Sequence, residues 1–287
     1  MFSRQCKLEA LRRLLVIPLL ASLFGCHIFK YSLATFDGKG AVPAEAEPVK
    51  LPNRYSQRVS QFVFISDFEL KSDQPVFKEL TDLREQIIRD LGLPSPAVLV
   101  QVYLFEDRQR YCRYMRGRYP DLPERRAFFV AQPKSAGGGD DLIVFTFLGD
   151  HLRQDLRHEL THAVLHSVLK DVPLWLDEGL AEYYELPPEA RGINPVHLAT
   201  YRREGLRPNL ARLELLSQVH QMTQTEYREA WAWVRLMLHD KPEAKQALVG
   251  YLKQLRFNSN PGPLQPRLEG CYDDLEAALL SHLGNLK

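Results

Sequence analysis

The stretch HELTH at residues 158–162 lies within residues 150–169, a segment whose apolar residues recur with a helical period. Residues four apart lie on one face of an α-helix, so the imidazoles of His158 and His162 point the same way and can share one metal ion. Glu159 leans towards the same side, where a carboxylate can accept a proton from a metal-bound water. The H-E-x-x-H pattern therefore predicts a metal-dependent active site on a helix.

A second helical stretch, LWLDEGLAEYYE at residues 174–185, offers the third protein ligand that a catalytic metal needs. Glu178 is separated from His162 by fifteen residues, enough for a turn and an antiparallel return helix. Glu182 lies one turn further along the same face, and we expect it to accept the free N–H of a ligating imidazole. Gly179 is small and would let the two helices approach closely, as would Ala181. The predicted metal ligands are His158, His162 and Glu178, with a fourth position left for water.

Two further histidines flank the motif. His166 continues the histidine face one turn beyond His162, about 6 Å further along the helix axis, and we expect it to be structural rather than a ligand. His151 is expected at the start of the helix, with Asp150 as the N-cap.

Together the two segments resemble the gluzincin metallopeptidases. The resemblance is strongest to the peptidase-MA-like group, which includes a bacterial family of unknown function (DUF1570) and is distantly similar to the M1 aminopeptidases. In M1 enzymes the second motif reads W-x-x-E-G-F-A, and Trp175, Glu178, Gly179 and Ala181 stand at the matching positions. The resemblance covers about residues 95–255 and implies a zincin-like catalytic domain, one Zn²⁺ per chain and hydrolysis of peptide bonds. The spacer is shorter than in M1 enzymes and their G-x-M-E-N motif is absent, so endo- and exopeptidase specificity both stay open.

A later segment, residues 226–238, resembles the part of the M1 enzymes in which a tyrosine opens a helix and stabilises the oxyanion. The resemblance implies that catalytic role for Tyr227. Trp231 stands where the M1 pattern has glycine, and a Tyr227 packed beneath the site is the alternative. The lesser candidates for the site are Tyr183, Tyr184, His197 and Tyr201.

The rest of the chain predicts a sheet followed by helices, which indicates an α+β fold. The expected strands are residues 58–66, 97–105, 126–131 and 142–147, with a hairpin turn at residues 137–139. One helix is expected at residues 76–91, and a second is expected to begin after its N-cap Asp107 and to end near residue 118. The expected catalytic domain is residues 54–287, with the sheet and metal helix in residues 54–169 and a helical part in residues 170–287. Residues 142–147, just before the metal helix, are expected to line the cleft and to pair with an extended substrate.

The first 25 residues have the pattern of a secretory signal peptide of the lipoprotein type. A basic region precedes an apolar stretch, residues 14–25, that is too short to span a bilayer. The stretch ends in LFGC at residues 23–26, which resembles a bacterial lipobox, so Cys26 is the expected lipidation site; simple secretion and an uncleaved anchor are the alternatives. Residues 26–53 are expected to be a tether. The protein is therefore expected to be exported and held at the membrane of the cell envelope through its N-terminal lipid.

The composition and the cysteines bear on the core, on the partners and on a possible disulfide. With 45% hydrophobic residues and a formal charge of +1, the chain has the material for a core and no global charge that would attract nucleic acid. Arginines and tyrosines alternate in residues 108–126, which favours a solvated helix face over a site for an envelope polyanion; export argues against nucleic acid as a partner. Cys112 and Cys271 could form a disulfide in an exported protein or remain two buried thiols.

The sequence therefore predicts an exported, lipid-anchored zinc peptidase that acts on a peptide or protein substrate. The alternative is a catalytically silent envelope lipoprotein that holds metal or peptide through the same site.

Overall fold

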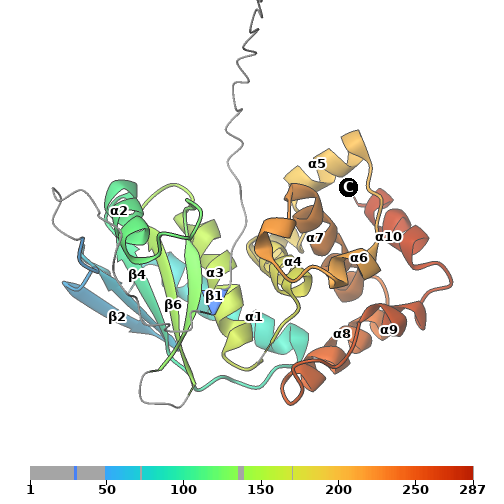
Figure 1. Cartoon of the computed structure of the whole chain (residues 1–287), viewed down its shortest axis with the longest axis horizontal. Helices are drawn as coiled ribbons and strands as arrows, with labels where there is room; N and C mark the ends of the chain where they lie inside the picture. The colour runs from blue at the N-terminus through green and yellow to red at the C-terminus, as the bar shows by residue number, and fades with distance from the viewer. Residues whose placement is uncertain (1–28, 31–48, 72, 135–138, 170, 287) are drawn as a thin grey trace, which may run out of the picture.

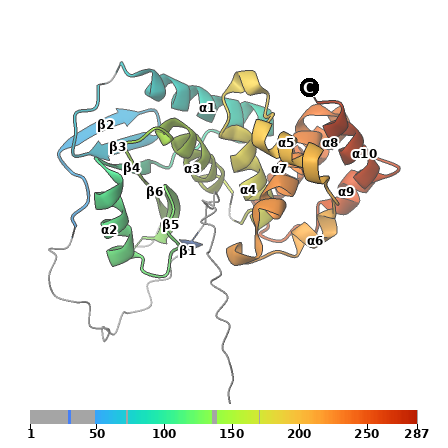
Figure 2. The same ribbon diagram turned by 90° about the horizontal axis from the view of Figure 1, so that it is seen from above.

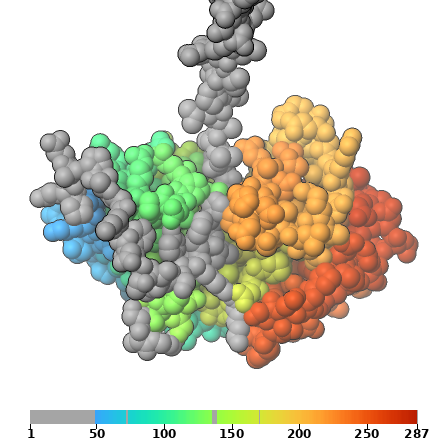
Figure 3. Space-filling view, viewed as in Figure 1, coloured from blue at the N-terminus to red at the C-terminus, as the bar shows by residue number. Residues whose placement is uncertain are grey.

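The computed structural model of the chain describes residues 29–30, 49–71, 73–134, 139–169 and 171–286. They form an α+β fold in which the sheet comes first and most of the helices follow, as expected (Figure 1). The described residues up to 169, which contain the sheet, are called the sheet lobe, and residues 171–286 are called the helical lobe. The two lobes lie side by side (Figure 3). The expected signal peptide, including Cys26, and most of the expected tether fall outside the described residues. Within the described ranges, no helix combines the length and apolar character needed to cross a membrane.

The sheet has six strands in the order β1-β5-β6-β4-β3-β2. Its strands are β1 (Phe29–Lys30), β2 (Tyr55–Val59), β3 (Phe62–Ser66), β4 (Val100–Phe105), β5 (Phe128–Pro133) and β6 (Asp140–Phe147). Strands β3, β4 and β6 run parallel, whereas β2 and β5 are antiparallel to their neighbours β3 and β6. The antiparallel pairing of β5 with β6 agrees with the predicted hairpin, although residues 135–138 of its turn lie outside the described part.

The segment predicted as one strand, residues 58–66, instead contains the end of β2, a turn and the whole of β3. The chain turns at Ser60, whose φ of 56° is in the left-handed region, and β2 then pairs antiparallel with β3. Neither residue of this turn is glycine, asparagine or aspartate, the residues that usually mark a tight hairpin turn. The alternation of apolar side chains continues into β3, so the sequence carries no visible break.

The expectation that residues 142–147 pair with an extended substrate is wrong. These residues form most of β6, which is an interior strand paired with β4 on one side and β5 on the other. Its backbone groups are therefore already engaged in the sheet. The strand beyond β6 is β5, and its outer side pairs with the two residues of β1, which belong to the segment expected to be only a tether.

Ten α-helices are found in the described residues. They are α1 (Pro75–Leu91), α2 (Arg108–Arg118), α3 (Leu152–His166), α4 (Leu174–Tyr184), α5 (Pro195–Glu204), α6 (Leu210–Glu214), α7 (Gln224–His239), α8 (Pro242–Leu255), α9 (Gln265–Glu269) and α10 (Leu275–Gly284). Asp107 caps α2 as predicted, accepting a hydrogen bond of 2.8 Å from the backbone N–H of Arg110. Helix α3 begins one residue later than expected, because His151 rather than Asp150 occupies the N-cap position.

Helices cover both faces of the sheet, α1 and α3 on one face and α2 on the other (Figure 2). Alternate residues of each strand point to opposite faces, so Phe129 of β5 joins the core under α3 whereas Phe128 joins the core under α2. Helix α3 is therefore packed directly on β5 and β6, which fixes the position of the predicted metal helix relative to the sheet.

The arginine- and tyrosine-rich segment is explained by the amphipathic character of α2. Tyr111 is buried against Phe105 of β4, and Arg108 and Arg116 are exposed on the opposite side. Cys112 is also buried on this side of the sheet. Both Cys112 and Cys271 are free thiols, so the disulfide considered above is not formed; Cys271 is only half-buried.

Helix α4 lies between α3 and α7, and a glycine sets its distance from α7. A Cβ atom at Gly179 would lie 2.7 Å from the carbonyl oxygen of Ala230 and 3.0 Å from the side chain of Val234. Both contacts belong to α7. The close approach that Gly179 was expected to allow therefore occurs between α4 and α7, not between the two helices that carry the predicted ligands.

We expect the substitution Gly179→Ala to lower the free energy of unfolding by about 1–3 kcal/mol, because the added methyl group meets the backbone of α7 and forces the helices apart. Urea denaturation with excess chelator, so that metal binding does not contribute, would measure the change. The control is Gly250→Ala in α8, where a Cβ meets nothing within 4 Å and the better helix former should add about 0.5–1 kcal/mol. Equal stability of Gly179→Ala and the unmodified chain would contradict this account of the contact.

Candidate metal centre

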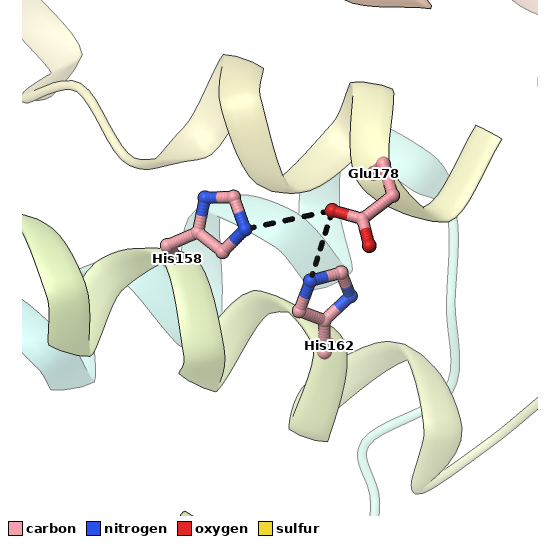
Figure 4. A group of neighbouring side chains, drawn as sticks. All are labelled: His158, His162 and Glu178. Atoms are coloured by element: carbon pink, nitrogen blue, oxygen red, sulfur yellow. Dashed lines mark ion pairs between the residues drawn. The ribbon is translucent and has the colours of Figure 1, made fainter. Parts of the chain in front are cut away.

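Helices α3 and α4 bring the three predicted ligands together. His158 and His162 lie one turn apart on α3, and both rings face the Glu178 carboxylate on α4 (Figure 4). Glu178 Oε2 is 3.7 Å from His158 Nε2 and 3.8 Å from His162 Nε2. One potential ligand atom from each residue lies within 4.8 Å of the other two.

The burial of these side chains fits a bound cation. Glu178 and His162 have no exposed surface, and His158 is 7% exposed. Among the described residues, neither carboxylate oxygen of Glu178 has a hydrogen-bond partner. An ionised carboxylate in this position costs several kcal/mol unless a positive charge compensates it. The 3.7–3.8 Å separations are too long for hydrogen bonds but close to the roughly 3.4 Å between two ligand atoms of a tetrahedral metal with bonds of about 2.1 Å.

Each imidazole is oriented by a carboxylate on its other nitrogen. Glu185 Oε2 lies 2.9 Å from His158 Nδ1, and Asp177 Oδ2 lies 3.0 Å from His162 Nδ1. A carboxylate that accepts a hydrogen bond from Nδ1 leaves the Nε2 lone pair for a metal and fixes the direction of the ring. Both Nε2 atoms are in this way aimed at the space beside Glu178.

These contacts correct the role predicted for Glu182. Its Oε2 atom lies 2.9 Å from His197 Nε2 on α5, while Glu185 and Asp177 take the positions beside the two ligand histidines. Glu178, Glu182 and Glu185 are spaced i, i+4 and i+7, so helical periodicity puts all three on one face and cannot decide which of the last two reaches His158. Asp177, which directly precedes the third ligand in the sequence, is fully buried and was not predicted to take this position.

The pKa directions of the carboxylates reflect this network. Burial acts to raise the pKa of Asp177, but the neighbouring His162 and His166 hold it well below its ordinary value. Burial likewise acts to raise the pKa of Glu182, and its hydrogen bond to His197 outweighs this and lowers it. Burial and the charge of Glu182 together raise the pKa of Glu185.

His166 has the structural role predicted for it. Its Nε2 atom lies 3.3 Å from Asp177 Oδ2, and its ring stacks on Phe129 of β5 with the centroids 5.6 Å apart. A cavity of about 490 Å³ opens at this end of α3, lined by His166 together with residues such as Leu142 and Arg256. The His166 ring therefore lines the cavity and contacts Asp177, and Asp177 in turn lies beside Nδ1 of His162.

The two predicted catalytic residues are both buried. Glu159 follows His158 on α3 and is 3% exposed. Tyr227 lies in the first turn of α7, one turn before Ala230 on the face that packs against α4. Tyr227 therefore lies in the part of the core beside α4, and the roles assigned to Glu159 and Tyr227 above stay predictions.

The lesser candidates separate into two groups. Tyr183 pairs with His239 at 2.7 Å, and Tyr201 donates to the carbonyl of Leu280, so both belong to the packing of the helical lobe. Tyr184 is buried in the same core. His197, in contrast, contacts Glu182 and therefore adjoins the candidate site.

A buried arginine fixes the end of α4. Arg157, 2% exposed, donates from Nε to the carbonyl of Glu185 at 3.2 Å and from Nη2 to the carbonyl of Leu186 at 2.6 Å. Its Nη1 atom is 3.4 Å from Glu79 Oε1 on α1. A cation at the carbonyl end of a helix satisfies groups that have no partner within the helix. Arg157 therefore ties α4, and with it Glu185, to the helix that carries His158.

Comparison with known proteins gives no identification. The chain matches no model of a known protein family, and no curated protein matches it.

We expect the purified protein to bind about one divalent metal ion per chain, and His162→Ala to bind none, because the imidazole is one of only three ligand groups described at the site. Elemental analysis after incubation with zinc and removal of the excess would measure both values. His220→Ala, at an exposed histidine of the helical lobe, is the control and should retain the metal. A wild-type chain without metal, or a metal content that His162→Ala does not change, would argue against the site.

Arg157→Met should lower the free energy of unfolding by about 3 kcal/mol, because the carbonyls of Glu185 and Leu186 lose their donor and Glu79 loses a partner. The matched control is Arg153→Met on the same helix, whose side chain is 69% exposed and also pairs with Glu79, and whose loss should cost less than about 1 kcal/mol. Chemical denaturation of both variants would decide whether burial, rather than charge pairing alone, makes Arg157 important.

Proposed function

We propose that the protein is a zinc-dependent peptidase with a zincin-like catalytic domain of the gluzincin type. The observation that carries the proposal is the buried pair of histidines on α3 facing a Glu178 that has no hydrogen-bond partner among the described residues, with Glu159 next to the first histidine. Two imidazoles and one carboxylate are a ligand set typical of catalytic zinc. Structural zinc sites usually have four protein ligands, whereas three leave a position for water or substrate.

The proposed reaction assigns a task to each residue around the site. When bound, zinc would lower the pKa of a coordinated water and polarise the substrate carbonyl. Glu159 would accept a proton from the attacking water and would then pass it to the leaving amine. Glu185 and Asp177 hold the two imidazoles in place throughout. Tyr227 donates a hydrogen bond to the oxyanion that develops on the former carbonyl.

The strand most suited to an extended substrate is β5 rather than β6. It is the neighbour of β6 on the outer side of the sheet, and its Phe129 stacks on the ring of His162 with the centroids 6.2 Å apart. A peptide that adds to this edge gains backbone hydrogen bonds without any requirement on its sequence. It would take the place of β1, which pairs with Val130 and Ala131.

The proposed setting is the cell envelope. Export, cleavage before Cys26 and lipidation of that residue would hold the peptidase at the membrane surface, where it would act on peptides or proteins of the same compartment. The alternative function is a catalytically silent lipoprotein that binds metal or peptide at the same residues. The two functions differ in whether peptide bonds are broken.

The substitution Glu159→Gln should leave the metal content at about one per chain and lower the rate of hydrolysis by a factor of about 10² or more, because an amide cannot accept the proton from water. Mass spectrometry of a mixed peptide library would measure hydrolysis before and after treatment with chelator and after zinc is restored. Glu189→Gln, at an exposed glutamate, is the control and should behave as the wild type. Full hydrolysis by Glu159→Gln would disprove the mechanism, and a metal-loaded wild type that cleaves nothing would favour the silent lipoprotein.

A further inference from the structure

A second cluster of polar side chains adjoins the candidate metal site. Ligand-type atoms of His158, Glu182 and Glu185 lie within 4.8 Å of one another. Glu185 has a task there, because it orients the His158 ring. Glu182 has none in the proposed reaction, although it is 4% exposed and its carboxylate lies on the same face of α4 as Glu178. Its hydrogen-bond partner is His197, which comes from a different helix.

The ring of His197 has contacts with two other helices, and its backbone is held by the N-cap of α5. Glu182 Oε2 on α4 lies 2.9 Å from its Nε2 atom, and the indole of Trp231 on α7 lies beside it with the ring centroids 5.2 Å apart. Its backbone N–H donates to the side chain of Asn194, which caps α5. Trp231 is itself fixed by a 2.8 Å hydrogen bond from its indole N–H to the carbonyl of Gly192. The ring is therefore positioned before any substrate arrives, and binding to it costs little side-chain entropy.

His197 is also the most accessible side chain of this connected group. Its side chain is 16% exposed, compared with 9% for His158, 6% for Glu182 and none for Glu178. A molecule that approaches this group from solvent therefore meets His197 first.

The hydrogen-bonding capacity of the ring is only half used. An ionised carboxylate only accepts, so the Nε2 atom of His197 carries the hydrogen that Glu182 receives. No contact of Nδ1 is found among the residues that the structure describes. When the ring is neutral, Nδ1 accepts a hydrogen bond, and when the ring is protonated it donates one. A peptide unit has one N–H and one C=O, so the backbone of a peptide can bind to the ring in either state.

From this arrangement we infer that His197 contacts the substrate: it hydrogen-bonds the backbone of the bound peptide beside the scissile bond, and Glu182 positions it. The inference rests on the proposed function and adds to it a residue from α5 that the resemblance to other peptidases did not supply. It also accounts for the burial of Glu182, whose carboxylate holds His197 rather than a ligand histidine. A purely structural role, in which His197 only joins α5 to α4 and α7, is the competing explanation.

The test compares the full-length zinc-loaded protein with His197→Ala, His197→Gln and the control His220→Ala. The probe is a fluorescein-labelled peptide, chosen from the sequences that the wild type cleaves in a mixed peptide library. Its Kd is measured by fluorescence polarisation in the Glu159→Gln background, so that no turnover occurs, and kcat and KM are measured without that substitution. Zinc content and Tm are recorded for every variant.

We expect His197→Ala to raise the Kd of the peptide about tenfold or more and to lower kcat/KM to a similar extent, with about one zinc still bound. His197→Gln retains a polar group and should recover part of the affinity, and His220→Ala should match the wild type. Unchanged Kd and kcat/KM in His197→Ala would overturn the inference while leaving the proposed function intact. A second combination of results would also overturn the inference: His197→Ala loses zinc or stability, and His197→Gln binds the peptide no more tightly than His197→Ala does. A zinc-loaded wild type that neither cleaves nor binds any library peptide would overturn the proposed function, and this inference with it.

Discussion

The burial of the Glu178 carboxylate is the constraint on which the arrangement of α3 and α4 depends. A charged group without exposed surface is tolerated only where positive or polarisable groups face it at short range. The groups that do so, His158 and His162, both come from α3. One side chain therefore constrains both the rotation of each helix about its axis and the displacement of one helix along the other, and Arg157 ties the end of α4 to α3.

The polar groups around the site form layers. The three candidate ligands occupy the interior, and the carboxylates of Asp177 and Glu185 stand behind the imidazoles. Beyond them, Phe129 of the sheet supports His166 on one side and Trp231 of the helical lobe supports His197 on the other. Each layer restricts the rotamers of the layer inside it, which is how a protein holds ligand atoms near the positions a metal requires.

Features of this structure that depend on residues close together in the sequence could be predicted, and features that depend on contacts between distant segments could not. The H-E-x-x-H helix and the return of Glu178 depend on spacing along one or two helices, and the structure brings those three side chains together. The choice between Glu182 and Glu185 depends on which neighbouring helix offers a partner, and helical periodicity is the same for both. The position of β6 inside the sheet depends on the order of strands that are distant in sequence, so its apolar pattern suits an edge and an interior strand equally. The turn at Ser60 contains no glycine, so the sequence does not mark it as a turn.

The contact between Gly179 and Ala230 links two properties that are usually considered separately. The candidate ligands all lie between residues 158 and 178, yet the helix that carries Glu178 rests on α7, about fifty residues further along the chain. A metal ion that binds only when α4 is docked must stabilise that docking by the free energy of its own binding. If the candidate site holds a metal ion, its affinity for that ion is a thermodynamic measure of how firmly α4 is docked on α7. Chelation would then loosen this docking, and a change at the contact of α4 with α7 would alter the dissociation constant of the metal without touching a ligand.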